Sequence, residues 1–133
     1  MHIAVTGAAG RIGRYVVRDL LAAGHSVQGI DAVAGSGLQV DLTDAGQVYG
    51  ALAGADAVVH MGAWANAGMV PDARTYGDNT AGTYNVFQAC ADLSAARRVG
   101  FQQPGLRFFF CTSSLCADRR GASNAPGQQL CPV

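Results

Sequence analysis

Two charged residue types are absent from this chain of 133 residues, which contains no lysine and no glutamate. Its charges come from nine arginines and nine aspartates, and they balance to a formal net charge of zero. A mechanism that needs a lysine, as proton relay or as phosphate clamp, is therefore excluded for this chain alone. The balance also gives no basic face for nucleic acid or for an anionic membrane, so we expect neither as a partner.

Long apolar runs and paired cysteines are also missing. The longest apolar runs fall far below the ~20 residues of a membrane span. Cys90, Cys111, Cys116 and Cys131 form no C-x-x-C pair, and no histidine lies at zinc-finger spacing from them, so we expect thiols and no metal site. Strand-like residues from Met1 to Thr6, in place of a charged region and a signal-peptide core, lead us to expect a cytoplasmic protein.

Short apolar runs alternate with segments of helical spacing. The sequence predicts strands at 3–5, 26–30, 38–40 and 57–61, and helices at 12–21, from Thr43 or Asp44 to Leu52, and from Pro71 to about Arg98. We expect the first helix to carry an apolar stripe of Ile12, Val16, Val17, Leu20 and Leu21, and the last to carry Tyr84, Phe87, Cys90 and Ala91 on one face. The connections are too long for hairpins, which favours right-handed crossovers and a doubly wound parallel α/β sheet in the order 3-2-1-4.

A glycine-rich turn joins the first strand to the first helix. It runs Thr6-Gly7-Ala8-Ala9-Gly10-Arg11-Ile12-Gly13. Gly7 permits a tight turn, Gly10 lets the main chain approach a diphosphate, and Gly13 allows the helix to pack closely on the strand. The helix N-terminus supplies bare N–H groups and a favourable dipole for the anion. The alternative is a tight turn that binds no ligand.

Asp31 ends the second strand, 18 residues after Gly13. An acidic residue at this place accepts hydrogen bonds from the adenosine ribose and disfavours a 2′-phosphate, which favours NAD. Arg11 and Arg14 keep NADP as an alternative cofactor. For Asp31 itself the alternative is a solvated turn aspartate.

With three further stretches, this loop resembles the extended short-chain dehydrogenase/reductases of the NAD-dependent epimerase/dehydratase type. Residues 40–43 resemble the family's D-L-T-D element, 58–65 resemble V-V-H-L-A-A, and 79–86 resemble N-V-x-G-T-x-N-V. The resemblance covers about residues 1–99 and implies a Rossmann-type fold, truncated here, and a parent enzyme that is a homodimer. It implies cofactor contacts at Gly7, Ala9, Gly10, Arg11, Ile12, Gly13, Asp31, Asp41, Leu42, Met61, Gly62, Ala63 and Asn79.

His60 and Trp64 invite catalytic roles, but simpler interpretations are favoured. We expect His60, at the end of a buried strand, to be a hydrogen-bonded core histidine. We expect Trp64 to pack beside the cofactor.

No residue receives a secure catalytic role. The family resemblance implies a fifth strand that starts near Arg98-Val99 and a Ser or Thr where that strand ends. It also implies a later Tyr-x-x-x-Lys whose lysine lowers the tyrosine pKa. Without lysine that pair cannot form, and no tyrosine follows Tyr84. Ser113, in Thr112-Ser113-Ser114 after the strand-like piece 107–111, is a weak candidate that comes 34 residues after Asn79.

The segment 100–133 departs from the pattern of residues 1–99, since it holds three of the four prolines and three of the four cysteines. Back-translated and read one nucleotide forward from Gly100, it permits a sequence close to V-F-S-S-x-x-x-Y-G. The same shift at residues 128–132 permits Ser-Ser-Tyr-Ala-Leu, which resembles the start of Y-x-x-S-K. We therefore hypothesise a frameshift near codon 99, in the gene or its recorded sequence; the alternative is a divergent C-terminus.

The expected function is that of an NAD(P)-dependent oxidoreductase of the epimerase/dehydratase type, acting on a sugar nucleotide or similar small molecule and inactive as this truncated chain. A non-catalytic module that binds or senses NAD(P) is the alternative. A third interpretation is an unstable product without function.

Overall fold

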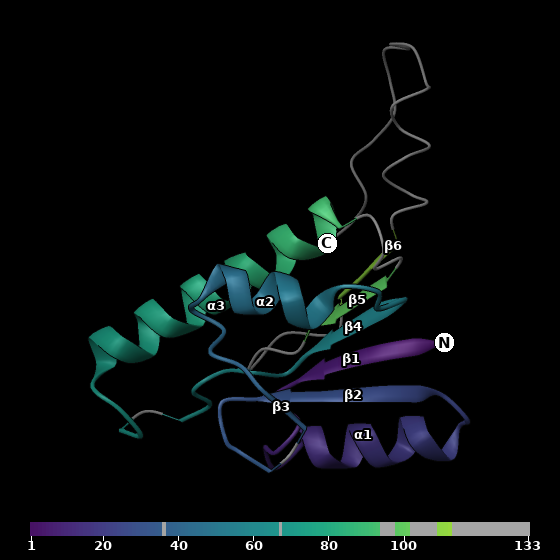
Figure 1. Ribbon diagram of the computed structural model, residues 1–133. Helices are drawn as coiled ribbons and strands as arrows, with labels where there is room; N and C mark the ends of the chain where they lie inside the picture. The colour runs from purple at the N-terminus through teal and green to yellow at the C-terminus, as the bar shows by residue number, and fades with distance from the viewer. Residues whose placement is uncertain (36, 67, 94–97, 102–108, 113–133) are drawn as a thin grey trace, which may run out of the picture.

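The computed structural model describes residues 1–35, 37–66, 68–93, 98–101 and 109–112. Within these ranges the strands form one six-stranded sheet in the order β3-β2-β1-β4-β5-β6 (Figure 1). The strands are β1 His2–Thr6, β2 Ser26–Asp31, β3 Leu38–Gln39, β4 Ala57–His60, β5 Arg98–Phe101 and β6 Phe109–Thr112. The pairings among β3, β2, β1 and β4 are all parallel, so the predicted order and direction are confirmed.

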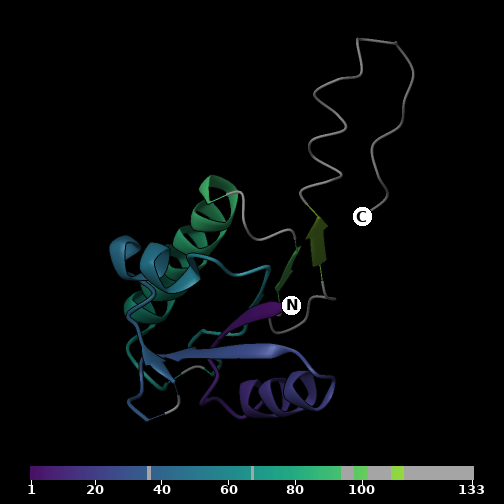
Figure 2. The ribbon, with the colours of Figure 1, turned by 45° about the vertical axis from the view of Figure 1, so that its right-hand side comes forward.

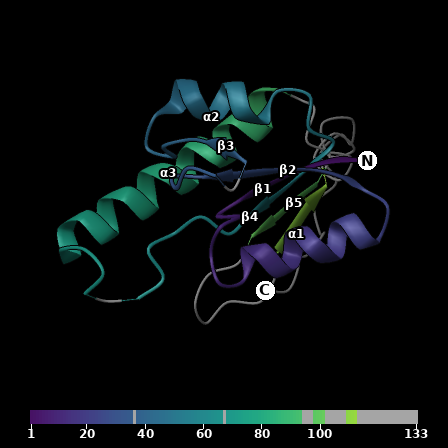
Figure 3. The ribbon, with the colours of Figure 1, turned by 60° about the horizontal axis from the view of Figure 1, so that its bottom comes forward.

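Helices cover both faces of the sheet. Helix α1 (Gly13–Ala22) lies on one face, and α2 (Ala45–Leu52) and α3 (Asp72–Asp92) lie on the other (Figures 1 and 3). Strand side chains alternate between these faces, so Ile3 and Val5 pack toward α1 while Ala4 packs toward α2 and α3. The larger core cluster, beneath α2 and α3, consists of Ala4, Ile30, Val40, Val48, Ala51, Leu52, Ala55, Val58, Val86, Ala89 and Cys90.

The predicted apolar stripe of α1 is confirmed only in part. Val16, Val17 and Leu20 pack against the sheet, but Ile12 and Leu21 are about half exposed, at 51% and 54%. A single helix on this face touches the strands along a narrow line. Side chains at the margins of the stripe therefore remain in solvent.

Helix α3 differs from its predicted extent. It ends at Asp92, and Arg98, which was expected in the helix, begins β5. The reason is a long-range contact: Val99 pairs with Val58 in the parallel ladder between β4 and β5. Among the described residues no helix combines the length and the apolar character needed to cross a bilayer.

Of the four residues predicted to share one face of α3, only Cys90 is buried. Gly82, Val86, Ala89 and Cys90 are buried, whereas Tyr84 and Phe87 are 64% and 40% exposed and Ala91 is exposed too. A Cβ at Gly82 would lie 3.0 Å from Cβ of Leu42. The helix thus approaches the loop after β3 through its small residues, and this turns the aromatic side chains outward.

Helix α2 begins as the sequence predicts, with Asp44 as its N-cap. The Asp44 carboxylate accepts a hydrogen bond from the Gln47 main-chain N–H at 3.1 Å. This bond, together with one from the Gln47 side chain, lowers the pKa of Asp44.

Strand β6 runs antiparallel to β5, with Arg98 opposite Thr112 and Phe101 opposite Phe109 (Figure 2). It lies within one or two residues of the strand-like piece predicted at 107–111. Because Phe101 at the carboxyl end of β5 pairs with His60, Thr112 lies at the opposite end of the ladder. Strand β6 therefore ends beside the amino-terminal end of β5, whereas the glycine-rich loop lies at the carboxyl end of β1.

Candidate functional site

The strand order reverses between β1 and β4, which is where doubly wound sheets have their ligand crevice, and the loops after the carboxyl ends of both strands begin there. Gly7 follows β1 with φ +69°, and a Cβ there would lie 2.7 Å from the Gly62 nitrogen and from the Met61 carbonyl atoms. The loops after the two strands thus meet main chain to main chain.

The glycine-rich loop is wound tightly beneath α1. The Gly10 N–H donates to the Gly7 carbonyl at 3.0 Å, and a Cβ at Gly13 would lie only 2.0 Å from that same oxygen. The positive φ of Gly7 confirms the tight turn predicted there, whereas Gly13 packs against main-chain atoms of Gly7 and Ala8 in the loop and not against the strand.

Three main-chain donors remain at the end of this loop. Within the described part of the chain, the N–H groups of Arg11, Ile12 and Gly13 have no hydrogen-bond acceptor. They lie at the N-terminus of α1, where the helix dipole adds partial positive charge. The arrangement suits a phosphate group.

Asp31 ties the end of β2 to this loop. Its Oδ2 accepts a hydrogen bond from the Ala9 N–H at 2.8 Å, and its Oδ1 accepts one from the Val33 N–H at 3.1 Å. Ala9 was predicted as a cofactor contact, and its N–H already donates a hydrogen bond to Asp31. A carboxylate has about four acceptor positions, so Asp31 keeps capacity for ribose hydroxyls.

Asp41 and Leu42 shape the loop after β3. Asp41 Oδ1 accepts hydrogen bonds from the Thr43 N–H at 2.9 Å and from the Thr43 hydroxyl at 2.8 Å. Leu42 lies between two glycines: a Cβ at Gly62 would be 2.6 Å from Leu42 Cδ1. The side-chain amide of Asn85 donates to the Leu42 carbonyl at 2.9 Å and thereby fixes this loop to α3.

Gly82 and Asn85 were not assigned roles from the sequence. Both occur in the stretch 79–86 that resembles the family motif, so a signal for them was present. Their contacts with Leu42, more than 39 residues earlier in the chain, could not be read from local spacing.

Asn79 holds the segment after β4 by two hydrogen bonds. Its Oδ1 accepts from the Trp64 N–H at 2.8 Å, and its Nδ2 donates to the Trp64 carbonyl at 3.2 Å. Asn79 therefore fixes the main chain two residues beyond Gly62. Ala63 lies within that segment.

The indole of Trp64 is anchored to α3. Its Nε1 donates to Asp78 Oδ2 at 2.8 Å, and Arg74 Nε donates to the same oxygen at 3.1 Å. The bond from Trp64, followed by those of Arg74, lowers the pKa of the Asp78 carboxyl. Beside Trp64 is an open cavity of about 690 Å³, lined by Trp64, Ala65, Asn66, Asp72, Thr75, Tyr76, Asn79, Thr80, Thr83 and Tyr84.

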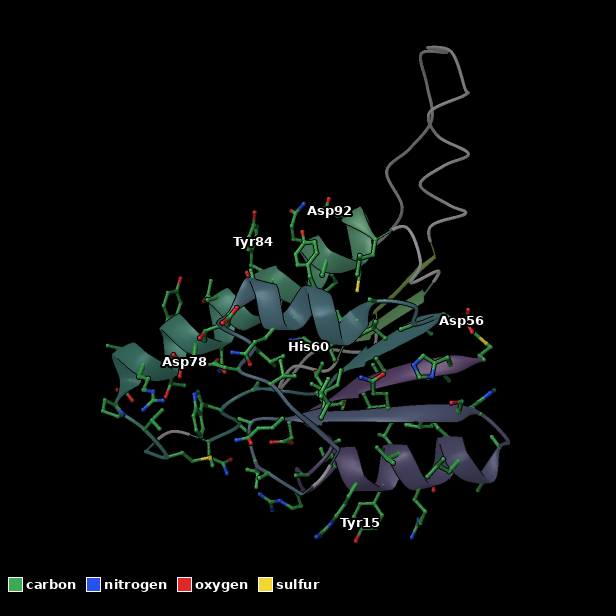
Figure 4. All side chains as sticks on the ribbon, in the orientation of Figure 1. Tyr15, Asp56, His60, Asp78, Tyr84 and Asp92 are labelled. Atoms are coloured by element: carbon green, nitrogen blue, oxygen red, sulfur yellow. The ribbon has the colours of Figure 1, made fainter. Side chains whose placement is uncertain are left out.

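His60 is a core histidine, as predicted. It is 1% exposed, and Figure 4 shows it between the sheet and the helices on the α2–α3 side. Its Nδ1 lies 2.7 Å from Thr6 Oγ1 and its Nε2 lies 3.3 Å from Thr83 Oγ1. Burial lowers the pKa of His60 from 6.5 to about 4, so the imidazole is neutral at physiological pH.

The catalytic positions implied by the family resemblance are not filled in the described residues. In the sequence, Phe101, the last residue of β5, is followed by Gln102 and Gln103 where the resemblance implies a Ser or Thr. Ser113, the weak candidate of the sequence, lies outside the described residues. No group of three or more His, Cys or Asp side chains within the described ranges could hold a metal ion.

The chain belongs to the NAD dependent epimerase/dehydratase family, whose model matches residues 3–130. It is 41% identical over 104 residues to the L-arabinose 1-dehydrogenase (NAD(P)(+)) of Haloferax volcanii, a match that covers 74% of this chain and 39% of that protein. NAD is the cofactor of this family.

Two solved structures show the same fold with NAD bound. One is a short-chain dehydrogenase/reductase superfamily protein from Agrobacterium tumefaciens, with a TM-score of 0.67, 32% identity, and coverage of 76% of this chain and 32% of that one. The other is UDP-glucose 4-epimerase from Thermus thermophilus, with a TM-score of 0.62, 30% identity, and coverage of 71% and 35%. The chain spans between 12% and 39% of the length of the curated relatives that it matches.

Proposed function

We propose that this chain is the dinucleotide-binding half of an NAD(P)-dependent oxidoreductase of the epimerase/dehydratase type, with NAD as the preferred cofactor. The observation that carries the proposal is a pair of neighbouring groups at the carboxyl ends of β1 and β2. The N–H groups of Arg11, Ile12 and Gly13 are unpaired among the described residues, and the Asp31 carboxylate at the end of β2 is hydrogen-bonded to the same loop. A diphosphate and a ribose need these two groups in this order.

Each segment around this reversal of strand order has its own part in the proposal. The glycine-rich loop surrounds the pyrophosphate, Asp31 binds the ribose, and Asp41 with Leu42 borders the adenine. The exit of β4 passes under the pyrophosphate and the nicotinamide ribose, and Asn79 supports it. The full set is Gly7, Ala9, Gly10, Arg11, Ile12, Gly13, Asp31, Asp41, Leu42, Met61, Gly62, Ala63 and Asn79, with Ala9 acting through Asp31.

The bound dinucleotide would supply hydride transfer, and the substrate would be a sugar nucleotide or a related sugar. The names of two relatives support this class, since one is an L-arabinose dehydrogenase and the other a UDP-glucose epimerase. Residues 1–99 form the dinucleotide-binding unit in this proposal. Residues 100–133 replace, through a shifted reading frame, the chain that would carry the catalytic residues.

The chain as written binds the cofactor without turning it over. It has no lysine and no tyrosine after Tyr84, so nothing in it can hold a phenol at a working pKa. A non-catalytic NAD(P)-binding or sensing module would share this property. The two candidates differ at the gene: only a former enzyme has a Tyr-x-x-x-Lys encoded in the shifted frame.

Isothermal calorimetry of the 133-residue chain tests the proposal. NAD should bind with one site per chain, more tightly than NADP, and Gly13→Ala should abolish binding. Adenosine, which lacks the pyrophosphate, should bind far more weakly. Absence of NAD binding to a folded chain would show the proposal to be wrong.

A further inference from the structure

A series of three polar side chains, two of them buried and the third partly buried, links β1, β4 and α3. Thr6 of β1 and His60 of β4 are each 1% exposed, and Thr83 of α3 lies beyond them. Thr6 Oγ1 and His60 Nδ1 are 2.7 Å apart, and His60 Nε2 and Thr83 Oγ1 are 3.3 Å apart. Figure 4 shows where His60 sits in this layer.

The hydrogen bonds that link these three side chains run in one donor-to-acceptor direction. Thr6 Oγ1 accepts the Gly62 N–H at 3.2 Å, and it shares the Met61 N–H, at 3.1 Å, with the Thr6 carbonyl. A hydroxyl group has two lone pairs and one proton. With N–H groups on both lone pairs, the Thr6 proton is donated to His60 Nδ1, so the imidazole proton is on Nε2 and is donated to Thr83 Oγ1.

We propose that His60 is a positioning residue of the dinucleotide site, held by Thr83 as the neutral Nε2–H tautomer so that Thr6 keeps both lone pairs on the Met61 and Gly62 amides. The proposal rests on the dinucleotide function proposed above. Met61 and Gly62 are also the residues whose main-chain atoms a Cβ at Gly7 would meet at 2.7 Å. We call the hydrogen-bonded series Thr6–His60–Thr83 the relay. The relay therefore sets how closely the loop after β4 approaches the glycine-rich loop.

The opposite tautomer has a structural cost. An Nδ1–H would need a lone pair of Thr6 Oγ1, and it would displace the N–H of either Met61 or Gly62. Burial keeps the pKa of His60 at about 4, which leaves Nδ1 free to accept at neutral pH. Thr83 also lines the 690 Å³ cavity, so the relay connects the loop after β4 to that cavity.

Nuclear magnetic resonance of the full chain, labelled with ¹⁵N-histidine, measures the tautomer directly. A long-range ¹H–¹⁵N correlation spectrum distinguishes Nδ1–H from Nε2–H, and His60→Gln assigns the signal among the three histidines. We expect a single Nε2–H form at neutral pH. An Nδ1–H form or a protonated ring in the unmodified chain would overturn the relay.

Two changes at Thr83 separate the relay from simple packing. Thr83→Val keeps the shape but removes the acceptor, and we expect a mixture of tautomers and an NAD affinity lowered about fivefold, the loss of one neutral hydrogen bond. Thr83→Ser keeps the hydroxyl and should keep both the tautomer and the affinity. A Thr83→Val chain with unchanged spectra and affinity would refute the proposal.

The two proposals fail separately. If the unmodified chain binds no NAD, the proposed function is wrong, and the tautomer spectra still decide the relay. If NAD binds but His60 is not in the Nε2–H form, only the relay is wrong.

Discussion

Asp31 accepts a hydrogen bond from the main-chain N–H of Ala9, with 2.8 Å between Oδ2 and the nitrogen. The residue expected to read the ribose therefore also braces the loop expected to hold the phosphates. Changes at Asp31 can act on cofactor preference through its charge and on loop order through this bond. Different substitutions separate the two effects.

Asp31→Ala should erode the preference for NAD over NADP by about 1–3 kcal/mol, because a charged acceptor is lost. Asp31→Asn should lose part of the preference while keeping an acceptor for Ala9. Calorimetry with both cofactors measures the difference. Asp19→Asn, at an exposed ion pair on α1, is the matched control and should change neither affinity. Tighter NADP binding by the unmodified chain would reverse the assignment.

Gly13→Ala should disrupt the start of α1. Its Cβ would lie 2.0 Å from the Gly7 carbonyl oxygen, so the main chain itself must move. We expect a loss of about 2 kcal/mol or more in the free energy of unfolding, together with loss of NAD binding. Gly50→Ala is the control: Gly50 lies inside α2 with nothing within 4 Å, and alanine there should stabilise the helix by about 0.5–1 kcal/mol. Urea unfolding compares the two variants.

Because the pKa of His60 is lowered in the folded chain, the free energy of unfolding should depend on pH. The pKa of His60 is about 4 in the folded chain and 6.5 as the ordinary value, so below pH 6.5 the unfolded chain binds a proton that the folded chain does not. The free energy of unfolding should therefore fall by roughly 3 kcal/mol as the pH drops from 7 to about 4. His60→Gln should flatten this slope, and His25→Gln should leave it in place. Equal slopes for the unmodified chain and His60→Gln would contradict the prediction.

Asn79→Ala should release the segment after β4, because both hydrogen bonds to the Trp64 main chain are lost. Trp64 is the single tryptophan, so its fluorescence reports on this segment alone. We expect emission at longer wavelength and weaker NAD binding. Gln88→Ala, at the other end of α3, should change neither quantity. Unaltered emission in Asn79→Ala would show that the indole bond to Asp78 suffices to hold the segment.

The 133-residue chain should show no dehydrogenase or epimerase turnover with any sugar or sugar nucleotide. A version corrected by one nucleotide near codon 99, and read on to its stop, should oxidise or reduce the nicotinamide. Absorbance at the nicotinamide band follows the reaction. Turnover by the uncorrected chain, or the lack of an encoded Tyr-x-x-x-Lys in the shifted frame, would contradict this expectation.

The sequence predicts the local features of this fold well and its long-range features poorly. The bounds of β1, β2 and β4 follow from apolar runs that end at Thr6, Asp31 and His60. The end of α3 does not follow from such local runs. It depends on Val99 pairing with Val58 in the sheet, which is a long-range contact. The outward turn of Tyr84 likewise depends on Gly82 approaching Leu42.

The candidate site shows the same division. The glycine spacing and Asp31 could be found from the sequence because they lie at strand ends, in motif order. The bond between Asp31 and Ala9, and the relay from Thr6 through His60 to Thr83, join residues 22 or more positions apart. Nothing in local spacing indicates such partners. The antiparallel direction of β6 was also beyond prediction, since a four-residue apolar run carries no sign of its direction.

Gly7 and Gly62 differ in the atoms that an added side chain would meet. A side chain at Gly7 would strike main-chain atoms of Met61 and Gly62, which no other substitution can remove. A side chain at Gly62 would strike Cδ1 of Leu42, which a smaller residue at position 42 would withdraw. Relatives of this chain should therefore tolerate change at position 62 in company with position 42, while position 7 has no compensating partner and should stay glycine.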